Sequence, residues 1–496
     1  MLRIAWNMKQ DITPPAMAYP LPGSARLKRS TVIKLILAGI LFLLVVISYL
    51  SGAIENEPSK AVASTGIVVL AMLIGIALIL WDVRFGVAIF LVTSALSPRI
   101  GTNFRLTDFI TPIMLLSWGG LVLRGQRATL RTPVTVPIVL VSLLMIGSTL
   151  YGLGIGMVPD YMAAVYIIGK RLEYFAIFFM ALNVIQDRGW ARATLAIFLL
   201  GALAGAMISL ATAQADTDVH ARRAVGLDEA NYNTFAGFLT LAVGLSLAGA
   251  LQAKNRILRP ALGFLAVVFI VAMLKSYSRE GYVILAVALI MLGVLRYRIL
   301  LPILAISALV SPWVLPKSVI ERAIDTVTQV KEYNQGDVGG NSFSARLSAW
   351  DWRLSEWFAK SPILGTGVGS IELSVDNEYV LRLCEGGTLG FLAFLILLAS
   401  LWRFLARTAH ALRGTELEPF AYGFLAAFVA LIVQGTVAAT FTTIRTMEPF
   451  WVIAGLLGGA VLAEANRLPA PETAHAEAAP AQPARSTLPP FMPRSV

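Results

Sequence analysis

Apolar stretches of about 20 residues recur along this chain from Leu35 to Leu462, and an α-helix needs that length to cross the hydrocarbon core of a bilayer. Breaks containing Arg, Pro or Gly separate the stretches. Charged residues make up 14% of the 496-residue chain, whereas soluble domains carry about 25%. The sequence therefore predicts an all-α, polytopic membrane protein and excludes a water-soluble one.

We expect about fourteen transmembrane helices. They lie near residues 35–53, 62–81, 85–98, 107–123, 134–153, 168–185, 193–213, 233–251, 260–275, 281–295, 299–316, 384–402, 418–437 and 449–464. The chain then has five parts. These are a cytoplasmic N-terminal tail at 1–34, transmembrane helices 1–11 at 35–316, one long outer loop with short helices at 317–383, transmembrane helices 12–14 at 384–464, and a disordered Ala/Pro-rich cytoplasmic tail at 465–496.

Lys and Arg gather in every second loop between these helices, for example at Arg124, Arg188 and Arg407. The positive-inside rule places such loops in the cytoplasm, so both termini are expected there. It also explains the net charge of +11, because arginines spread over short loops do not form the basic patch that nucleic acid needs. The single cysteine, Cys384, excludes an internal disulfide and a multi-cysteine metal site.

The two longest loops of the opposite side, 214–232 and 317–383, carry basic residues against this rule. With residues at the same ends of nearby helices they form a set. Its members are Arg105, Arg171, Arg222, Arg223, Lys275, Arg279, Arg346, Arg353, Arg382 and Arg445. Singly, each side chain is explained by snorkelling or by a salt bridge. Together they indicate an anion held at the outer face. Arg171, within a predicted span, needs a partner such as Glu173 or a helix-end carbonyl.

Two segments of the long loop suggest contact with phosphate. Arg346, Trp350, Arg353 and Trp357 have helical spacing and form one stripe, which suits either lipid headgroups at the interface or bidentate contact with phosphate. The glycines of the run 365–369 could turn backbone N–H groups around a phosphate, or could form a plain turn. The run is not a Walker loop, since no Gly-Lys-Ser/Thr follows it.

The segment 375–387 brings carboxylates, an amide and an arginine to the start of span twelve. A general base that deprotonates a sugar hydroxyl would have to sit at this level. Local structure offers another explanation, with Asp376 or Asn377 as a helix N-cap and Glu378 paired with Arg382 one turn later. Both explanations can hold at once.

Four motifs occur in a recognisable order. They are Arg223-x-x-Gly226 before Asn231, Ser278-Arg279-x-Gly281, Arg346-x-x-x-Trp350 before Pro362-x-x-Gly365-x-Gly367-x-Gly369, and Asn377-x-Tyr379 before Glu385-x-Gly387. In this order the chain resembles the O-antigen ligase and polysaccharide polymerase family of bacterial membrane proteins. The resemblance is clearest from Arg222 to Trp402.

This resemblance implies an inverting, metal-independent glycosyltransferase without a cofactor, in the bacterial inner membrane. It implies an undecaprenyl-pyrophosphate-linked glycan as donor and a lipid-linked or lipid A core acceptor, with membrane lipids, a chain-length regulator and a flippase as further candidate partners. Nucleic acid is not an expected partner. The family's phosphate-binding arginines carry over to Arg223, Arg279 and Arg346, and to Arg171.

The chain departs from the ligases at one position. They have a histidine before the Asn-x-Tyr segment, where this chain has Asp376, and its histidines are His220, His410 and His475. An Asp at this place is similar to exopolysaccharide polymerases, so we favour repeat-unit polymerase over ligase. A lipid-linked sugar flippase is a third hypothesis. We see no internal repeat of the kind many transporters have, and the charge lies toward one face, which favours an enzyme.

The predicted site has two groups of residues. The catalytic candidates are Asp376, Asn377 and Glu378, and the substrate or pyrophosphate-binding candidates are Arg171, Arg222, Arg223, Arg279, Arg346, Arg353, Arg382 and Tyr379. No metal site is expected. Asp376 is our preferred base, because the resemblance puts it nearest to the place of the ligases' histidine. Glu378 is open to neutralisation by Arg382, and Glu385 to burial in an ion pair. His220 is the reserve candidate.

The sidedness is tested by reporter fusions. Fusions near Gly339 should report an outer location, and fusions near Arg127, Arg256 and Arg407 a cytoplasmic one, because only the latter loops obey the positive-inside rule. A cytoplasmic result at Gly339 would place the whole candidate site on the other side of the membrane.

Overall fold

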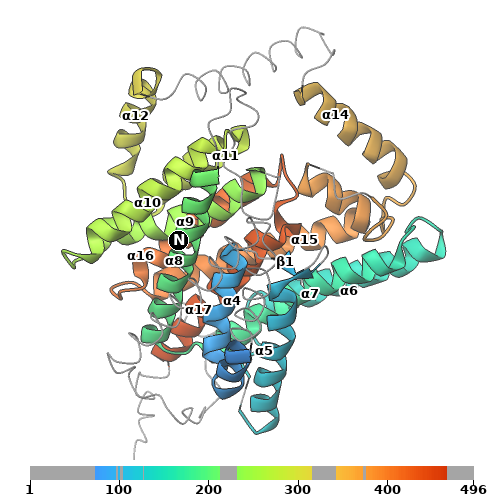
Figure 1. The fold of residues 1–496 in the computed structure, drawn as a ribbon. Helices are drawn as coiled ribbons and strands as arrows, with labels where there is room; N and C mark the ends of the chain where they lie inside the picture. Colours follow the sequence, from blue (N-terminus) through green and yellow to red (C-terminus); the bar gives the residue numbers. More distant parts are fainter. Residues whose placement is uncertain are drawn as a thin grey trace, which may run out of the picture.

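The computed structural model describes residues 73–96, 99–100, 104–126, 128–212, 232–314, 342–371 and 376–465, and almost all of them are helical (Figure 1). The helices are α4 (Val83–Leu96), α5 (Leu106–Leu123), α6 (Thr135–Gly154), α7 (Tyr161–Val184), α8 (Arg188–Thr212), α9 (Tyr232–Gln252), α10 (Leu258–Lys275), α11 (Arg279–Leu295), α12 (Leu300–Val314), α14 (Ser342–Arg353), α15 (Glu378–Ala411), α16 (Glu418–Gln434) and α17 (Ile444–Ala465).

Short elements complete the described part of the chain. A π turn, Leu354–Phe358, continues α14, and a 3-10 turn, Thr440–Thr442, precedes α17. The strands described are β1 (Arg99–Ile100) and β2 (Phe104–Arg105), which pair antiparallel. The all-α prediction is therefore confirmed for the described residues apart from this two-residue ladder.

Seven of the described helices are long and apolar enough to cross a membrane: α5, α6, α8, α9, α10, α15 and α17. Each of the last twelve predicted spans coincides with a helix. The first lies outside the described residues, and of the second, 62–81, only the helical residues 73–81 are described. α7 is long but carries Lys170, Arg171 and Glu173, as its charged sequence led us to expect. The total of fourteen spans and the sidedness remain predictions.

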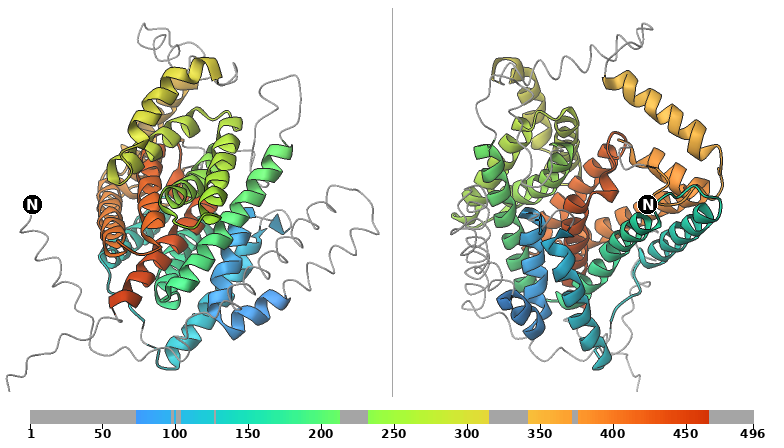
Figure 2. Two further views of the ribbon diagram at one scale, coloured as in Figure 1. Left: turned by 90° about the vertical axis from the view of Figure 1, so that its left-hand side faces the viewer. Right: turned by 45° about the vertical axis from the view of Figure 1, so that its right-hand side comes forward.

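The core lies around α9, α16 and α17, which are the most deeply buried long helices (Figure 2). Glycines permit the closest helix contacts. A methyl group at Gly244 of α9 would lie 2.5 Å from the carbonyl oxygen of Gly423 in α16, and one at Gly455 of α17 would lie 2.5 Å from that of Phe178 in α7. Small residues at helix crossings are what membrane helices use to gain packing contacts, because apolar lipid gives them little hydrophobic drive.

The predicted twelfth span differs from expectation. Its helix, α15, begins at Glu378 rather than at residue 384, and it breaks at Gly387, where φ is +61° and ψ −166°. The carbonyls of Cys384 and Glu385 accept hydrogen bonds from the N–H groups of Thr366 and Gly367, both at 2.9 Å. These contacts replace the bonds that the next helical turn would have supplied.

The segment that contains Thr366 and Gly367 also provides hydrogen-bond partners for the backbone N–H groups that follow the break. The N–H groups of Thr388 and Leu389 donate to the carbonyls of Pro362 and Ile363 at 2.8 and 3.2 Å. Segment 362–367 thus exchanges two hydrogen bonds in each direction with the broken helix. Unsatisfied backbone groups are costly within a membrane, so this exchange stabilises the break and fixes segment 362–367 against α15.

Gly387 should be essential to this arrangement. A side chain is strained at its backbone angles, and an added Cβ would collide with the carbonyl of Ile363. We expect Gly387→Ala to lose about 2 kcal/mol or more of stability, measured as a lower thermal midpoint of the purified protein in detergent. Gly390→Ala is the matched control, because a Cβ there meets no atom within 4 Å and alanine favours a helix. Equal midpoints for the two variants would contradict the break.

Candidate functional site

The predicted Ser-Arg-x-Gly motif forms a rigid start to α11. The Ser278 hydroxyl accepts a hydrogen bond from the Gly281 N–H at 3.0 Å and donates one to Asn233 Oδ1 of α9 at 2.7 Å. The residue before it, Tyr277, has a φ of +51°, a strained backbone conformation of the kind that often marks functional sites. Arg279 is the first residue of α11, so this end of the helix presents an arginine and, next to it, Glu280.

Three motifs that are distant in sequence meet at this point. Arg346 of α14 forms an ion pair with Glu280, with 2.8 Å between Nη2 and Oε1. Its Nε lies 3.7 Å from Oδ2 of Asp376. Glu280 is buried, while the Asp376 side chain is half exposed. The structure therefore places the predicted base within reach of a predicted phosphate-binding arginine, and adds a carboxylate that the sequence analysis did not single out.

The residues after Asp376 have structural partners. Asn377 caps α15, because its Oδ1 accepts from the N–H groups of Tyr379 and Val380 at 2.9 and 3.1 Å. Glu378 is fully buried. Its Oε1 accepts from Arg382 at 2.7 Å and its Oε2 from the Phe441 N–H at 2.9 Å.

The Asn377 cap and the Glu378–Arg382 pair, which the sequence analysis expected, are thus both present. The Tyr379 hydroxyl donates to the carbonyl of Ile432 at 2.8 Å. Asp376 is the residue of this segment that keeps an exposed carboxylate.

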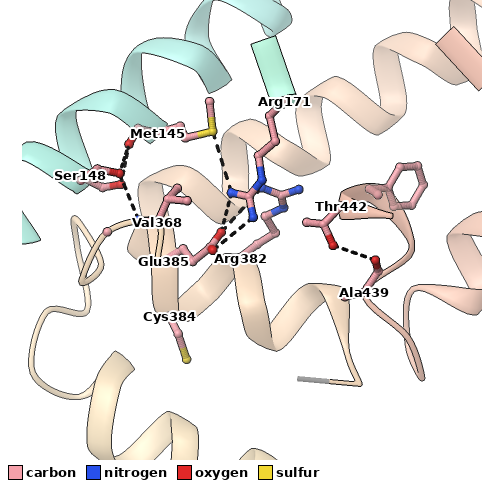
Figure 3. A network of polar contacts seen from close by, with 12 residues as sticks. Met145, Ser148, Arg171, Val368, Arg382, Cys384, Glu385, Ala439 and Thr442 are labelled. Atoms are coloured by element: carbon pink, nitrogen blue, oxygen red, sulfur yellow. Dashed lines mark hydrogen bonds and ion pairs between the residues drawn. The ribbon is translucent and has the colours of Figure 1, made fainter. Parts of the chain in front are cut away.

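A buried ion-pair network surrounds Glu385 at the break in α15 (Figure 3). Arg171 of α7 binds Glu385 with both terminal nitrogens, at 2.7 and 3.1 Å. Arg382 lies 3.8 Å from the same carboxylate. Glu385 is therefore buried in an ion pair, as the sequence analysis considered. Its partner is Arg171, which does not pair with Glu173.

Glu173 belongs to a second buried group of charges. Lys170 of α7 is 2.8 Å from Glu173 and 3.6 Å from Glu448 of α17, and it also pairs with Asp108 of α5. Lys170 and Arg171 are consecutive but point to different clusters, because neighbouring side chains on a helix differ by about 100°. These pairs join α7 to α5, α15 and α17.

A pocket opens beside Arg171 and Arg382 between α6, α7, α15 and α17. Of its lining residues only these two carry charge. The rest of the wall is mostly apolar, with Met145, Phe394 and Trp451 among its members. The pocket thus combines two cationic side chains with an apolar wall, in a space no larger than a few water molecules.

Two sequence interpretations are settled by contacts. Trp350 and Trp357 pack against a buried cluster that includes Leu381 and Cys384, so they turn inward rather than toward headgroups. Trp352 is the exposed tryptophan of this segment. In the run 365–369, the N–H groups of Thr366, Gly367 and Val368 bind Cys384 O, Glu385 O and Thr149 Oγ1. The run is therefore a packing turn, because these N–H groups are already used within the protein.

The other predicted residues have different surroundings. Arg222, Arg223 and His220 lie outside the described residues. Arg353 donates from Nη1 to the Ala349 carbonyl at 3.3 Å, on its own helix. Arg445 is fully buried, donates to the Ala95 carbonyl at 3.2 Å, and lies over the ring of Phe235. Its contacts thus join α17 to α4 and α9. Among the described residues, no group of three or more His, Cys, Asp or Glu side chains is arranged to hold a metal ion.

A known protein family matches the part of the chain that contains Arg346 and Asp376. Residues 264–395 match the family model described as O-Antigen ligase. The match begins in α10 and ends in α15, so it includes Arg279, Glu280, Arg346, Asp376 and Arg382. None of the curated proteins matches the chain.

The predicted resemblance to the O-antigen ligase and polymerase family is thereby confirmed for this region. With its apolar helices, the chain is a multi-pass membrane protein, and the match indicates a glycosyl-transferring enzyme of the ligase or polymerase type. The family implies lipid-linked glycans as substrates in general terms.

The Arg171–Glu385 pair should be needed for stability. Removing one member of a buried pair costs about 3–5 kcal/mol, because the other charge is left without its partner, whereas replacing both by apolar residues costs less. We expect Arg171→Met to lower the thermal midpoint in detergent strongly and Arg171→Met/Glu385→Leu to recover part of the loss.

The control is Lys360→Ala, which removes an exposed pair with Glu356 and should change stability by no more than about 1 kcal/mol. If Arg171→Met matched this control, the buried pair would have no structural role.

Proposed function

We propose that this protein is a membrane glycosyltransferase that polymerises undecaprenyl-pyrophosphate-linked oligosaccharide repeat units at the outer face of the inner membrane. The proposal depends on one observation: Asp376 lies 3.7 Å from Arg346, beside the helix start that carries Arg279. A base for the acceptor and a cation for the leaving group thus sit side by side. The match to the O-Antigen ligase family model over this region supports it.

The reaction would be a single displacement. The acceptor hydroxyl attacks the anomeric carbon of the donor glycan, and Asp376 takes the hydroxyl proton. The new bond joins the acceptor oxygen to the anomeric carbon, and the bond from that carbon to the pyrophosphate oxygen breaks. Its electron pair leaves with undecaprenyl pyrophosphate, so the anomeric configuration inverts.

Arginine would provide the electrostatic part of this mechanism. Charge builds up on the pyrophosphate as it leaves, and Arg346 and Arg279 would stabilise that charge, the role that a metal ion has in other transferases. Arg346 suits phosphate because its planar fork binds two oxygens at once.

The pocket beside Arg171 and Arg382 has a lining that suits a lipid-linked donor, although it is too small to hold one in this conformation. Its two cations and apolar wall match a ligand with an anionic head and a hydrocarbon tail. Both cations are held by carboxylates, so they are less available to bind a pyrophosphate than Arg346 is. We therefore assign Arg346 to the reaction, whereas the main effect of Arg171 and Arg382 is to hold α7 and α15 together.

Ligase activity is the second candidate. The Asp at the place of the ligases' histidine favours the polymerase, while the family description favours the ligase. A flippase is the third candidate, and the break in α15 is a feature that transporters share. Here, however, the four N–H and carbonyl groups described at the break bind segment 362–367, rather than facing an ion site as they do in transporters.

The base is tested by Asp376→Asn in purified protein with a lipid-linked donor. We expect donor binding and thermal midpoint to remain, while polymerisation slows by about a hundredfold, from the low end of the range for general base catalysis. Asp351→Asn is the control, because Asp351 is an exposed carboxylate on α14. Normal rates in Asp376→Asn would exclude this residue as the base.

Arg346 is tested by Arg346→Lys, which keeps the charge but loses the bidentate fork. We expect normal abundance in the membrane and a sharp fall in chain length. In cells, loss of a polymerase should leave single lipid-linked units outside the membrane, loss of a ligase should leave long chains on the carrier, and loss of a flippase should leave single units inside. Full activity of Arg346→Lys would make the arginine merely structural.

A further inference from the structure

Glu280 is an acidic residue placed among cations at the predicted phosphate site. Only 6% of its side chain is exposed, and Arg346 lies 2.8 Å from it. An acidic residue at this place would repel a pyrophosphate, and burying it costs solvation that only a partner can offset. Its position therefore calls for an explanation beyond a surface salt bridge.

The backbone holds Glu280 in place independently of Arg346. It lies in the first turn of α11, where the Ser278 hydroxyl caps the Gly281 N–H and is tied to Asn233 of α9. A Cβ at Gly281 would lie 3.0 Å from the Ala236 side chain, so α9 and α11 are in close contact here. Glu280 thus belongs to the rigid helix bundle, whereas Arg346 comes from α14, which has few contacts with that bundle.

Two carboxylates share the Arg346 guanidinium unequally. Oε1 of Glu280 lies 2.8 Å from Nη2 of Arg346, while Oδ2 of Asp376 lies 3.7 Å from Nε. A guanidinium released from Glu280 would be drawn to Asp376, because Asp376 would then be the nearest carboxylate described. It would form a closer ion pair with Asp376 and make that carboxylate a poorer proton acceptor.

We propose that Glu280 is a positioning residue that anchors Arg346 by one edge. The anchor turns the remaining edge of the fork toward the donor pyrophosphate and keeps Arg346 from pairing closely with Asp376. The inference rests on the proposed function and extends it to a residue that does not itself touch the substrate. Glu280 would act through the guanidinium alone, which makes its effect dependent on Arg346.

Glu280→Gln tests the anchor because it removes the charge and keeps the size. We expect kcat to fall by roughly tenfold, since an arginine out of position stabilises the transition state less. The KM for the lipid-linked donor should change by less than about threefold. Glu280→Asp keeps the charge with a shorter reach, so its kcat should lie between those of the wild type and Glu280→Gln. Glu356→Gln is the matched control, because Glu356 is an exposed glutamate in the turn that follows α14, the helix of Arg346.

A double-mutant cycle separates positioning from a purely structural role. Without the guanidinium there is nothing for Glu280 to position, so Glu280→Gln/Arg346→Gln should be no slower than Arg346→Gln alone. If the two losses multiplied instead, or if Glu280→Gln kept the wild-type kcat, the inference would be overturned. If Glu280→Gln did not accumulate in the membrane, Glu280→Asp would decide, with a wild-type kcat counting against the anchor.

The outcome also separates this inference from the proposed function. Full activity in both Arg346→Lys and Asp376→Asn would remove the proposed site altogether. Losses in those two variants together with wild-type kinetics in both Glu280 variants would leave the proposed function standing and remove only the role of Glu280.

Discussion

Backbone hydrogen bonding within the membrane constrains the rest of this structure. A helix that breaks among apolar neighbours leaves N–H and carbonyl groups that lipid cannot satisfy. At Gly387 the segment 362–367 supplies partners on both sides of the break. This exchange fixes the end of the long loop to α15, and it places Glu385 where α7 can reach it.

Buried charge is the second constraint, and the described pairs form two classes. Arg171, Arg382, Glu378 and Glu385 are buried and mutually paired, so their main effect is to hold α7 and α15 in register. Arg346 and Asp376 are partly exposed and loosely associated. Electrostatic catalysis requires groups that are both held in place and open to substrate. The second class is open to substrate, which is why the proposed mechanism uses it, and Glu280 holds its arginine in place.

Local sequence patterns predicted much of what lies along a single helix. Apolar runs located twelve helices, and Asn377 and the Glu378–Arg382 pair followed from capping and i, i+4 spacing. The site was predicted less completely. The search for an anion site considered basic residues, so Glu280 was passed over although it stands inside the Ser278–Gly281 motif. Lys170 is basic and was also missed, because it lies within a predicted span next to Arg171, the residue that was singled out there.

The sequence by itself determined the membrane character, the order of helices and the motifs that resemble the O-antigen ligase family. These follow from composition and from contacts between residues a turn apart, which neighbouring positions encode. Only the tertiary structure decided that Arg171 pairs with Glu385, 214 positions away, and that Glu280 and Asp376 share Arg346. Such pairs depend on which helices pack together and on the angle at which each side chain leaves its helix, and no local pattern in the chain specifies either.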